Sequence, residues 1–154
     1  MNTNKKELRV NAIKNGTVID HIPAGDLFKV IKILGLQNIT NTMTLGNNLE
    51  SKTQGFKGII KISGLFFEDD DIDRIALAAP NAKLNIIKDY TVVEKRQVNV
   101  PDTVRGIAKC VNPKCITNFE DNVTTKFTVI DKDNISLKCH YCEKITNKEN
   151  LRLQ

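Results

Sequence analysis

Cys110-Val-Asn-Pro-Lys-Cys115 and Cys139-His-Tyr-Cys142 are the two segments that decide how the C-terminal part of this chain folds. They contain all four cysteines of the 154-residue sequence, and twenty-three residues separate the two pairs. Zinc prefers four soft ligands at the corners of a tetrahedron, and two short cysteine turns joined by a hairpin provide that geometry. The pattern therefore predicts one closed structural zinc site with the ligands Cys110, Cys115, Cys139 and Cys142.

Three other uses of these cysteines fit the pattern less well. Two disulfides are one alternative, but the N-terminus shows no signal-peptide pattern, so we expect a cytoplasmic protein, in which disulfides are rare. A redox Cys-x-x-Cys leaves the other pair without a role. A catalytic zinc needs an open coordination position, which four thiolates do not leave. His140 lies between two ligands, and we expect it to face solvent.

The periodicity of the remaining chain predicts a two-unit α+β protein. The expected strands cover residues 8–13, 42–45 and 57–63, and an extended stretch with a bend near Asp89 covers residues 84–95. One helix is expected after Asp26 and stops at Gly35, and a second follows Asp69, Asp70 and Asp71 and ends at Pro80. A turn is expected over 14–17 and a polar loop over 46–55. In the strand over 57–63, Ile60 and Ile62 share one face, and Ile59 and Lys61 share the other.

This order corresponds to the ferredoxin-like βαββαβ pattern, whose sheet order 4-1-3-2 makes strands one, three and four neighbours. Residues 96–101 form a link to a small all-β, zinc-ribbon-like unit. In that unit, a hairpin over 124–130 and 135–138 carries the second cysteine pair toward the first. We assign residues 1–97 to the first unit and residues 102–154 to the second.

Polar residues on the three neighbouring strands indicate a nucleotide site. Lysines and a histidine can meet phosphates, and an aspartate accepts hydrogen bonds from ribose hydroxyls. The residues are Asp20, His21, Lys61, Asn85, Tyr90 and Lys95. The alternative is that the lysines are ordinary solvated side chains and that His21 bonds only to its own turn. The sequence has no Gly-rich phosphate loop, Ser/His/Asp set or catalytic carboxylate pair, which lowers the odds of an enzyme.

The formal charge of +5 leaves a nucleic-acid-binding zinc protein as the main alternative. Residues 101–154 contain nine basic and seven acidic residues, so four thiolates and a divalent ion bring this part of the chain to neutrality. Such a unit lacks the clustered charge that phosphate contacts need. A sheet that binds RNA also usually exposes aromatic side chains, and strands one and three offer none. A small-molecule-binding regulator with its own activity is a weaker alternative.

Several segments in the same order resemble the regulatory chain of aspartate carbamoyltransferase over nearly the whole sequence. They are Gly16-Thr-Val-Ile-Asp-His-Ile-Pro-Ala24, Ile59-Ile-Lys-Ile62, Ala79-Pro80, residues 85–90, Cys110-x4-Cys115 and Leu137-Lys-Cys-x-Tyr-Cys-Glu-Lys144. The resemblance implies a non-catalytic subunit. In that family it pairs with a separate catalytic chain, which condenses carbamoyl phosphate with aspartate in the committed step of pyrimidine synthesis. The family's first domain binds CTP as inhibitor and ATP as activator, and its zinc domain docks on the catalytic chain. Two catalytic trimers are joined through three regulatory dimers.

The resemblance also implies roles for individual residues. The residues expected to line the base and ribose edge are Val10, Asn11, Ala12 and Ile13, with Val18 adding an apolar contact. Asp20 and Lys61 are expected to reach the ribose, and His21 and Lys95 to face the triphosphate. The rest of the nucleotide pocket is expected to be formed by Asn85, Ile87, Tyr90 and Val92. Asn112 and Glu143, beside the zinc ligands, are expected to touch the catalytic chain. The sequence departs from the family pattern at Asn11, Lys114 and Gly25-Asp26, so the sign of the CTP and ATP effects does not follow from the resemblance.

Overall fold

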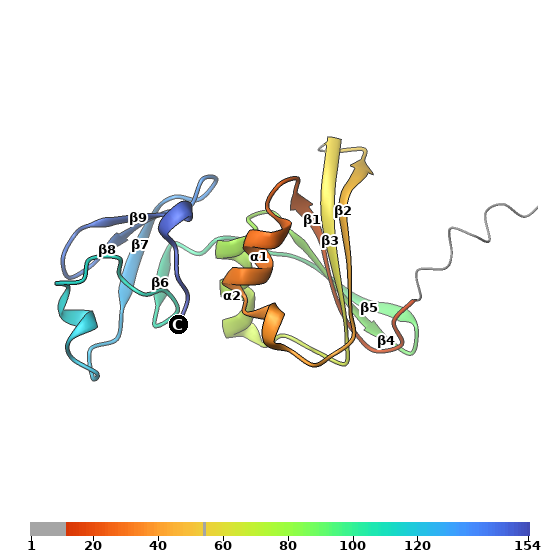
Figure 1. Ribbon diagram of the computed structural model, residues 1–154, viewed down its shortest axis with the longest axis horizontal. Coiled ribbons are helices and arrows are strands. Elements are labelled where there is room, and N and C mark those ends of the chain that lie inside the picture. The colour runs from red at the N-terminus through yellow and green to blue at the C-terminus, as the bar shows by residue number, and fades with distance from the viewer. Residues whose placement is uncertain (1–11, 54) are drawn as a thin grey trace, which may run out of the picture.

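The computed structural model describes residues 12–53 and 55–154, which form two antiparallel sheets with two helices between them (Figure 1). The first sheet has the order β2-β3-β1-β4-β5, and the second has the order β6-β7-β8-β9. Because β1 lies between β3 and β4, the predicted neighbours are confirmed, and β5 adds one more strand at the edge. The α+β class and the small all-β C-terminal unit are therefore as predicted.

The elements of the first unit are β1 (Gly16–Pro23), α1 (Leu27–Ile33), the 3-10 turn η2 (Leu36–Asn38), β2 (Met43–Ser51), β3 (Gly55–Ser63), α2 (Asp69–Ala78), β4 (Lys83–Lys88) and β5 (Thr91–Gln97). Those of the second unit are β6 (Thr103–Arg105), η3 (Ile116–Asn118), β7 (Lys126–Asp131), β8 (Ser136–Cys139), β9 (Ile145–Asn147) and η4 (Lys148–Asn150). None of the helices in these described parts of the chain is long and apolar enough to cross a membrane.

Both helices form where the apolar periodicity predicts them. In α1, Leu27, Val30 and Ile31 are buried, and Gly35 ends the segment with a φ of 68°, in the left-handed region that favours glycine. Asp69, Asp70 and Asp71 occupy the first turn of α2, where their charge complements the positive end of the helix. A reciprocal capping box between Glu68 and Asp71 fixes the start of α2.

The predicted first strand over 8–13 is wrong at Ala12 and Ile13, the two of its residues that the structure describes. Residues 8–11 lie outside the described residues, Ala12 and Ile13 are not in a strand, and β1 begins at Gly16, inside the predicted turn. As the central strand, β1 pairs with β3 on one side and with β4 on the other. Residues 16–19 are consequently buried without interruption, so the segment lacks the alternation that marks a half-exposed strand.

Two further predictions need correction. The expected polar loop over 46–55 is largely strand, because β2 continues to Ser51 and pairs with β3, with a register shift between Gly46 and Leu49. As an edge strand, β2 has no buried residue and therefore carries no clear apolar pattern. The extended stretch over 84–95 is a hairpin, and the bend near Asp89 is a complete reversal of the chain.

The helices pack on one face of the first sheet, and no helix of the described residues lies on the other face (Figure 1). Ile60 and Ile62, which are predicted to share a face, are fully buried on the helix side together with Ile19 and Leu84. The core continues into the second unit through Val98, Val104, Phe127 and Leu137. The predicted hairpin of the second unit is confirmed as β7 and β8, which hold Cys139 at the end of the strand pairing.

Candidate metal centre and effector-binding face

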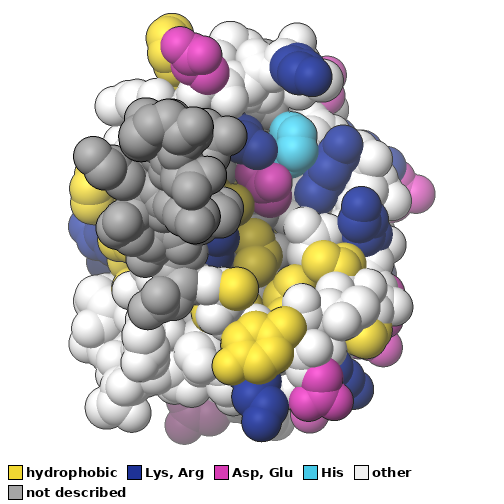
Figure 2. Space-filling view, turned by 90° about the vertical axis from the view of Figure 1, so that its right-hand side faces the viewer, with side chains coloured by type: hydrophobic (Ala, Val, Ile, Leu, Met, Phe, Trp, Pro, Cys, Tyr) yellow, Lys and Arg dark blue, Asp and Glu magenta, His cyan; other side chains and the backbone are white. Residues whose placement is uncertain are grey.

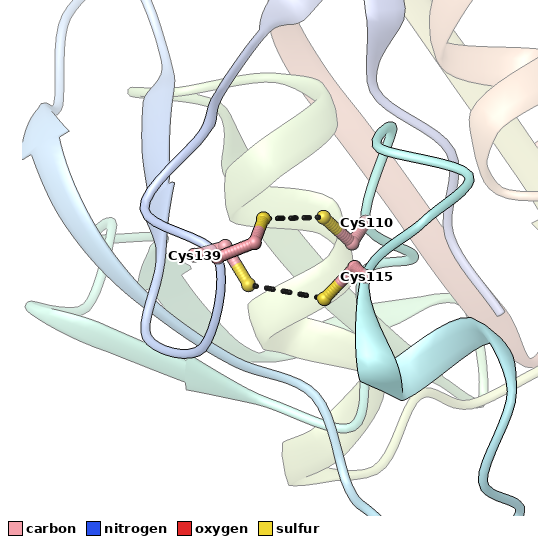
Figure 3. A group of neighbouring side chains, drawn as sticks. Cys110, Cys115 and Cys139 are labelled. Atoms are coloured by element: carbon pink, nitrogen blue, oxygen red, sulfur yellow. Dashed lines mark hydrogen bonds between the residues drawn. The ribbon is translucent and has the colours of Figure 1, made fainter.

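The four cysteines meet at one end of the second unit. Cys110 and Cys115 come from the loop after β6, Cys139 ends β8, and Cys142 lies in the turn before β9. All four Sγ atoms lie within 4.8 Å of one another. Figure 3 shows the sulfurs of the two segments pointing toward one another. The Sγ–Sγ distance is 3.6 Å between Cys110 and Cys142 and 3.7 Å between Cys115 and Cys139.

These distances fit a metal centre and not a pair of disulfides. A disulfide requires about 2.0 Å between sulfurs. A tetrahedron with zinc–sulfur bonds of ~2.3 Å has edges of about 3.8 Å, close to both measured distances. Four thiolates also fill a tetrahedral shell, so the geometry suits a structural ion better than a catalytic one.

Backbone hydrogen bonds hold both cysteine loops in shape. The N–H of Cys115 donates to the carbonyl of Asn112 at 3.0 Å, and the Asn118 amide donates to the carbonyls of Cys110 and Asn112 at 3.2 and 2.7 Å. In the second loop, the N–H of Glu143 donates to the carbonyl of Cys139 at 3.0 Å. The site is therefore preorganised by the protein itself.

The electrostatics of the thiols favour a cation at their centre. Burial raises the pKa of Cys110 and of Cys139, because a thiolate in an apolar environment loses its hydration. For Cys142, burial also acts to raise the pKa, but hydrogen bonds led by the Asn112 side chain outweigh it and bring the pKa to about 7. Thr117 donates a further hydrogen bond to the Cys115 sulfur at 3.2 Å. A bound metal ion supplies the charge that allows the buried thiols to ionise.

The predicted nucleotide residues form a row across the open face of the first sheet. Val18 of β1 lies opposite Lys61 of β3 and opposite Asn85 of β4, and Asn85 lies opposite Lys95 of β5. Directly opposed residues in an antiparallel sheet project from the same face. Ile87, opposite Val92, continues this arrangement toward the β4–β5 turn. The pairing thus brings six of the predicted residues onto one surface.

Asp20 and His21 lie at an irregularity in β1, at the edge of this row. The strand register shifts between Ile19 and Ile22, and His21 has a φ of 60°. The His21 N–H donates to the Asp20 carboxylate at 2.6 Å, and the His21 Nδ1 atom is buried without a hydrogen-bond partner. Figure 2 shows this face, on which a histidine lies among Lys or Arg side chains and an acidic side chain, beside a hydrophobic area.

Lys57 lies beside Asp20, and it is not among the candidate residues identified from the sequence. Its Nζ atom lies 2.9 Å from a carboxylate oxygen of Asp20, and both side chains are less than one-fifth exposed. The signal was present in the sequence, because Lys57, Ile59 and Lys61 alternate along one strand and so share a face. Asp20 is therefore held by Lys57, while Lys61 lies further along the same face.

The remaining predicted residues lie at the edges of the two sites. Val10 and Asn11 fall outside the described residues, Ala12 is exposed and Ile13 is half-buried. The Tyr90 N–H donates to the carbonyl of Lys14 at 2.9 Å, which brings the segment after Ile13 against the β4–β5 turn. Next to the metal centre, Asn112 is half-buried, and Glu143 and His140 are exposed, as expected for the histidine.

Comparisons with known proteins agree with this organisation. Residues 8–99 match the family described as "Aspartate carbamoyltransferase regulatory chain, allosteric domain", and residues 102–152 match the one described as "Aspartate carbamoyltransferase regulatory chain, metal binding domain". The aspartate carbamoyltransferase regulatory chain of Phocaeicola vulgatus is 58% identical over 153 residues, covering 99% of this chain and 98% of the relative. That of Bacteroides fragilis is 56% identical over 153 residues, 99% of each chain, and that of Pyrococcus horikoshii is 52% identical over 147 residues, 94% of this chain and 96% of the relative.

Proposed function

This chain belongs to the family of aspartate carbamoyltransferase regulatory chains, and from that membership we propose that it senses CTP and ATP and passes their effect to the catalytic chains through a zinc-bound docking unit. It is a regulatory, non-catalytic subunit with an allosteric domain and a metal-binding domain, and its family implies the catalytic chain as its partner. The proposal assigns the allosteric role to residues 1–97 and the docking role to residues 102–154. The proposal also places the protein in the cytoplasm, where four thiols stay reduced. Its regulatory role is assigned to pyrimidine synthesis.

The single observation that supports the nucleotide site most strongly is the row Lys61, Val18, Asn85 and Lys95 across three adjacent strand pairs. Two lysines flank an apolar and an amide side chain on a face that is not covered by either helix of the described chain. His21 and Lys95 are assigned to the triphosphate, and Asp20 and Lys61 are assigned to the ribose. The base is assigned to the main chain and side chains of the remaining residues, which are Val10, Asn11, Ala12, Ile13, Val18, Asn85, Ile87, Tyr90 and Val92.

CTP and ATP share the triphosphate, so contacts made by Lys95 and His21 give affinity for both nucleotides. Discrimination between the two then depends on base size and on main-chain hydrogen bonds near Ile13 and Tyr90. An effector changes the activity of an assembly only by binding one of its states more tightly, and such coupling is typically ~1–3 kcal/mol. The proposed regulation is therefore a shift between assembly states and involves no chemistry in this chain.

We assign zinc to the four-cysteine centre because its ligand set and sulfur spacing suit that ion. Cys110, Cys115, Cys139 and Cys142 would hold the ion, which supplies charge compensation and cross-linking to a small unit. Exposed apolar side chains next to these ligands, namely Val111, Ile116, Phe119 and Tyr141, offer a docking surface, and Asn112 and Glu143 are its proposed polar contacts. The proposed assembly is that of the family, with two catalytic trimers and three regulatory dimers.

The test of the nucleotide site is a CTP titration of the assembled enzyme with Lys61→Ala in the regulatory chain. We expect the nucleotide response to weaken at least tenfold or to vanish, while the zinc content and the co-purification with the catalytic chain stay unchanged. Lys52→Ala, which removes an exposed lysine from the same unit, is the matched control. An unchanged CTP titration in Lys61→Ala would remove Lys61 from the site, and purification without a catalytic chain would contradict the docking role.

A further inference from the structure

A basic cleft lies between the two units, on the helix side of the first sheet and away from the proposed nucleotide face. It is open to solvent, has a volume of about 1310 Å³, and is lined by α1, by the first cysteine loop and by the C-terminal segment. The C-terminal segment runs along the side of the second unit that faces the helices (Figure 1). The charged side chains in the lining are Lys29, Lys32, Lys109, Lys148, Arg152 and Glu149.

Three of the five cations in the cleft have no counter-ion among the residues that the structure describes. Lys148 binds Asp26 at 2.9 Å, and Lys29 lies 3.4 Å from Glu149. Lys32, Lys109 and Arg152 make no ion pair with any residue in the described ranges 12–53 and 55–154. The cleft therefore concentrates positive charge that the described parts of the protein do not neutralise.

The fold holds these cations together in spite of their mutual repulsion. Lys29 and Lys32 are three residues apart, so they share one side of α1. The N–H of Lys109 donates to the carbonyl of Arg152 at 2.9 Å, next to the bridge between Ala108 and Leu153. This pairing fixes two of the unpaired cations side by side. Like charges held in one cleft cost free energy, and a multiply charged anion placed among them removes that cost.

We propose that this cleft is a binding site for a small polyvalent anion that carries phosphate groups. Arg152 offers a planar fork that matches two phosphate oxygens, and Lys32 and Lys109 offer point charges from other segments. Three unpaired cations suit a chain of two or three phosphates better than a single monovalent ion. Because α1 contributes one wall and the C-terminal segment contributes the other, the bound anion holds the two units together.

The experiment is calorimetric titration of the full-length, zinc-bound chain with inorganic tripolyphosphate at fixed ionic strength. Tripolyphosphate has neither base nor ribose, so it probes the phosphate contacts alone. The test variant is K32Q/R152Q, which neutralises two exposed cations of the cleft. The matched control is K52Q/K138Q, which removes the same charge from exposed positions elsewhere. We expect the test variant to raise the tripolyphosphate Kd at least tenfold and the control to change it less than threefold.

A further variant separates the cleft from the nucleotide face. Lys95→Gln is expected to leave the cleft's tripolyphosphate binding in place, and K32Q/R152Q is expected to leave CTP binding unchanged. Loss of tripolyphosphate binding in Lys95→Gln alone, equal losses in the test and control variants, or no saturable binding at all would overturn the proposal. Displacement of tripolyphosphate when the catalytic chain is added would show that an acidic surface of that partner fills the cleft, and this result would overturn it too.

Discussion

Lys57 and Lys61 share a face of β3, but their surroundings differ. Lys57 is mostly buried against the Asp20 carboxylate, whereas Lys61 has no ion-pair partner among the described residues. A lysine that is already paired contributes little net charge to an incoming phosphate, and an unpaired one contributes its whole charge. The contrast explains why we assign Lys61 to ligand contact and Lys57 to positioning Asp20.

Gly16 is the glycine, among those that the structure describes, at which an added side chain would meet the nearest neighbouring atom. Its φ is +149°, and a Cβ atom at this position would lie 2.1 Å from the carbonyl oxygen of Ile62, in the neighbouring strand. The backbone of β1 cannot move away from β3 without breaking the hydrogen bonds between the two strands. We expect Gly16→Ala to lower the free energy of unfolding by roughly 2–4 kcal/mol.

Urea unfolding of the metal-loaded chain checks this expectation. Gly55→Ala is a suitable control, because its φ of +79° is also positive but a Cβ there meets nothing within 4 Å. Backbone strain alone would lower the stability of both variants by about 1 kcal/mol. Equal losses in the two variants would show that the close approach to Ile62 is unimportant.

At the scale of elements, the sequence predicts well those segments whose burial is one-sided. The helix α1 and the strand β3 both show one apolar face, so their positions and buried residues follow from periodicity. The central strand β1 is buried on both faces over residues 16–19, and the edge strand β2 has no buried residue, so neither shows an alternation of apolar and polar residues. Their positions are fixed by pairing with distant strands, which a local pattern does not contain.

Some residues of the candidate sites can be predicted from the sequence, and others are brought together only by the fold. The grouping of the four cysteines that could hold a metal ion follows from their spacing, because each pair lies within one short loop. Lys61, Asn85 and Lys95 are individually unremarkable in the sequence, and only the strand register places them in a row. The pairing of Asp20 with Lys57 depends on the irregular backbone at His21, a local conformation that the sequence does not indicate.

The β4–β5 turn combines backbone strain with a proposed ligand contact. Asp89 and Tyr90 both have positive φ, 51° and 66°, as a two-residue hairpin of type I′ requires. Tyrosine is unfavourable there by about 1 kcal/mol relative to glycine. We expect Tyr90→Gly to raise the free energy of unfolding by that amount and to weaken nucleotide binding, as at functional sites that store strain.

Thermal unfolding and CTP titration of the same preparation measure the two effects. Thr91→Gly, one residue beyond the turn, is the control, and it is expected to lower stability because it places glycine in a strand. A Tyr90→Gly variant that is less stable than the parent chain would show that the tyrosine side chain stabilises the turn.

The metal affinity of the four-cysteine site is expected to depend on pH. The pKa values of Cys110 and Cys139 are raised in the metal-free chain, so both thiols are protonated near neutrality and must release protons when the ion binds. Metal affinity therefore falls as pH is lowered. The protons of these two thiols alone give a change of roughly a hundredfold per pH unit, and Cys142, with a pKa of about 7, adds to it at the lower end of the range.

Competition with a zinc chelator between pH 6 and pH 8 measures that slope. We expect metal removal also to unfold the second unit, because its sheet is small and its core is partly cysteine. Circular dichroism with and without the chelator follows the unfolding. An affinity independent of pH would mean that the thiols are already ionised in the metal-free chain.

At the scale of the whole molecule, the proposed nucleotide face and the second unit are connected through the end of β1. His21 lies in the irregular part of that strand, and Asp26 follows it by five residues and begins α1. The Asp26 carboxylate does not cap the helix but binds Lys148 of the second unit at 2.9 Å. Both side chains are less than one-quarter exposed, so the pair is shielded from solvent more than an ordinary surface ion pair.

We expect this pair to carry part of the nucleotide signal between the units, and a double-mutant cycle tests it. Asp26→Asn and Lys148→Met should each lower the free energy of unfolding by about 1–2 kcal/mol, and the double variant should lose less than the sum of the two. In the assembled enzyme, each single variant should reduce the maximal CTP effect while CTP binding to the chain stays unchanged. A Lys29→Met variant, which removes the more exposed ion pair with Glu149, is the control. Strictly additive losses, or a full CTP effect in all variants, would mean that the signal passes between the units through their shared apolar core.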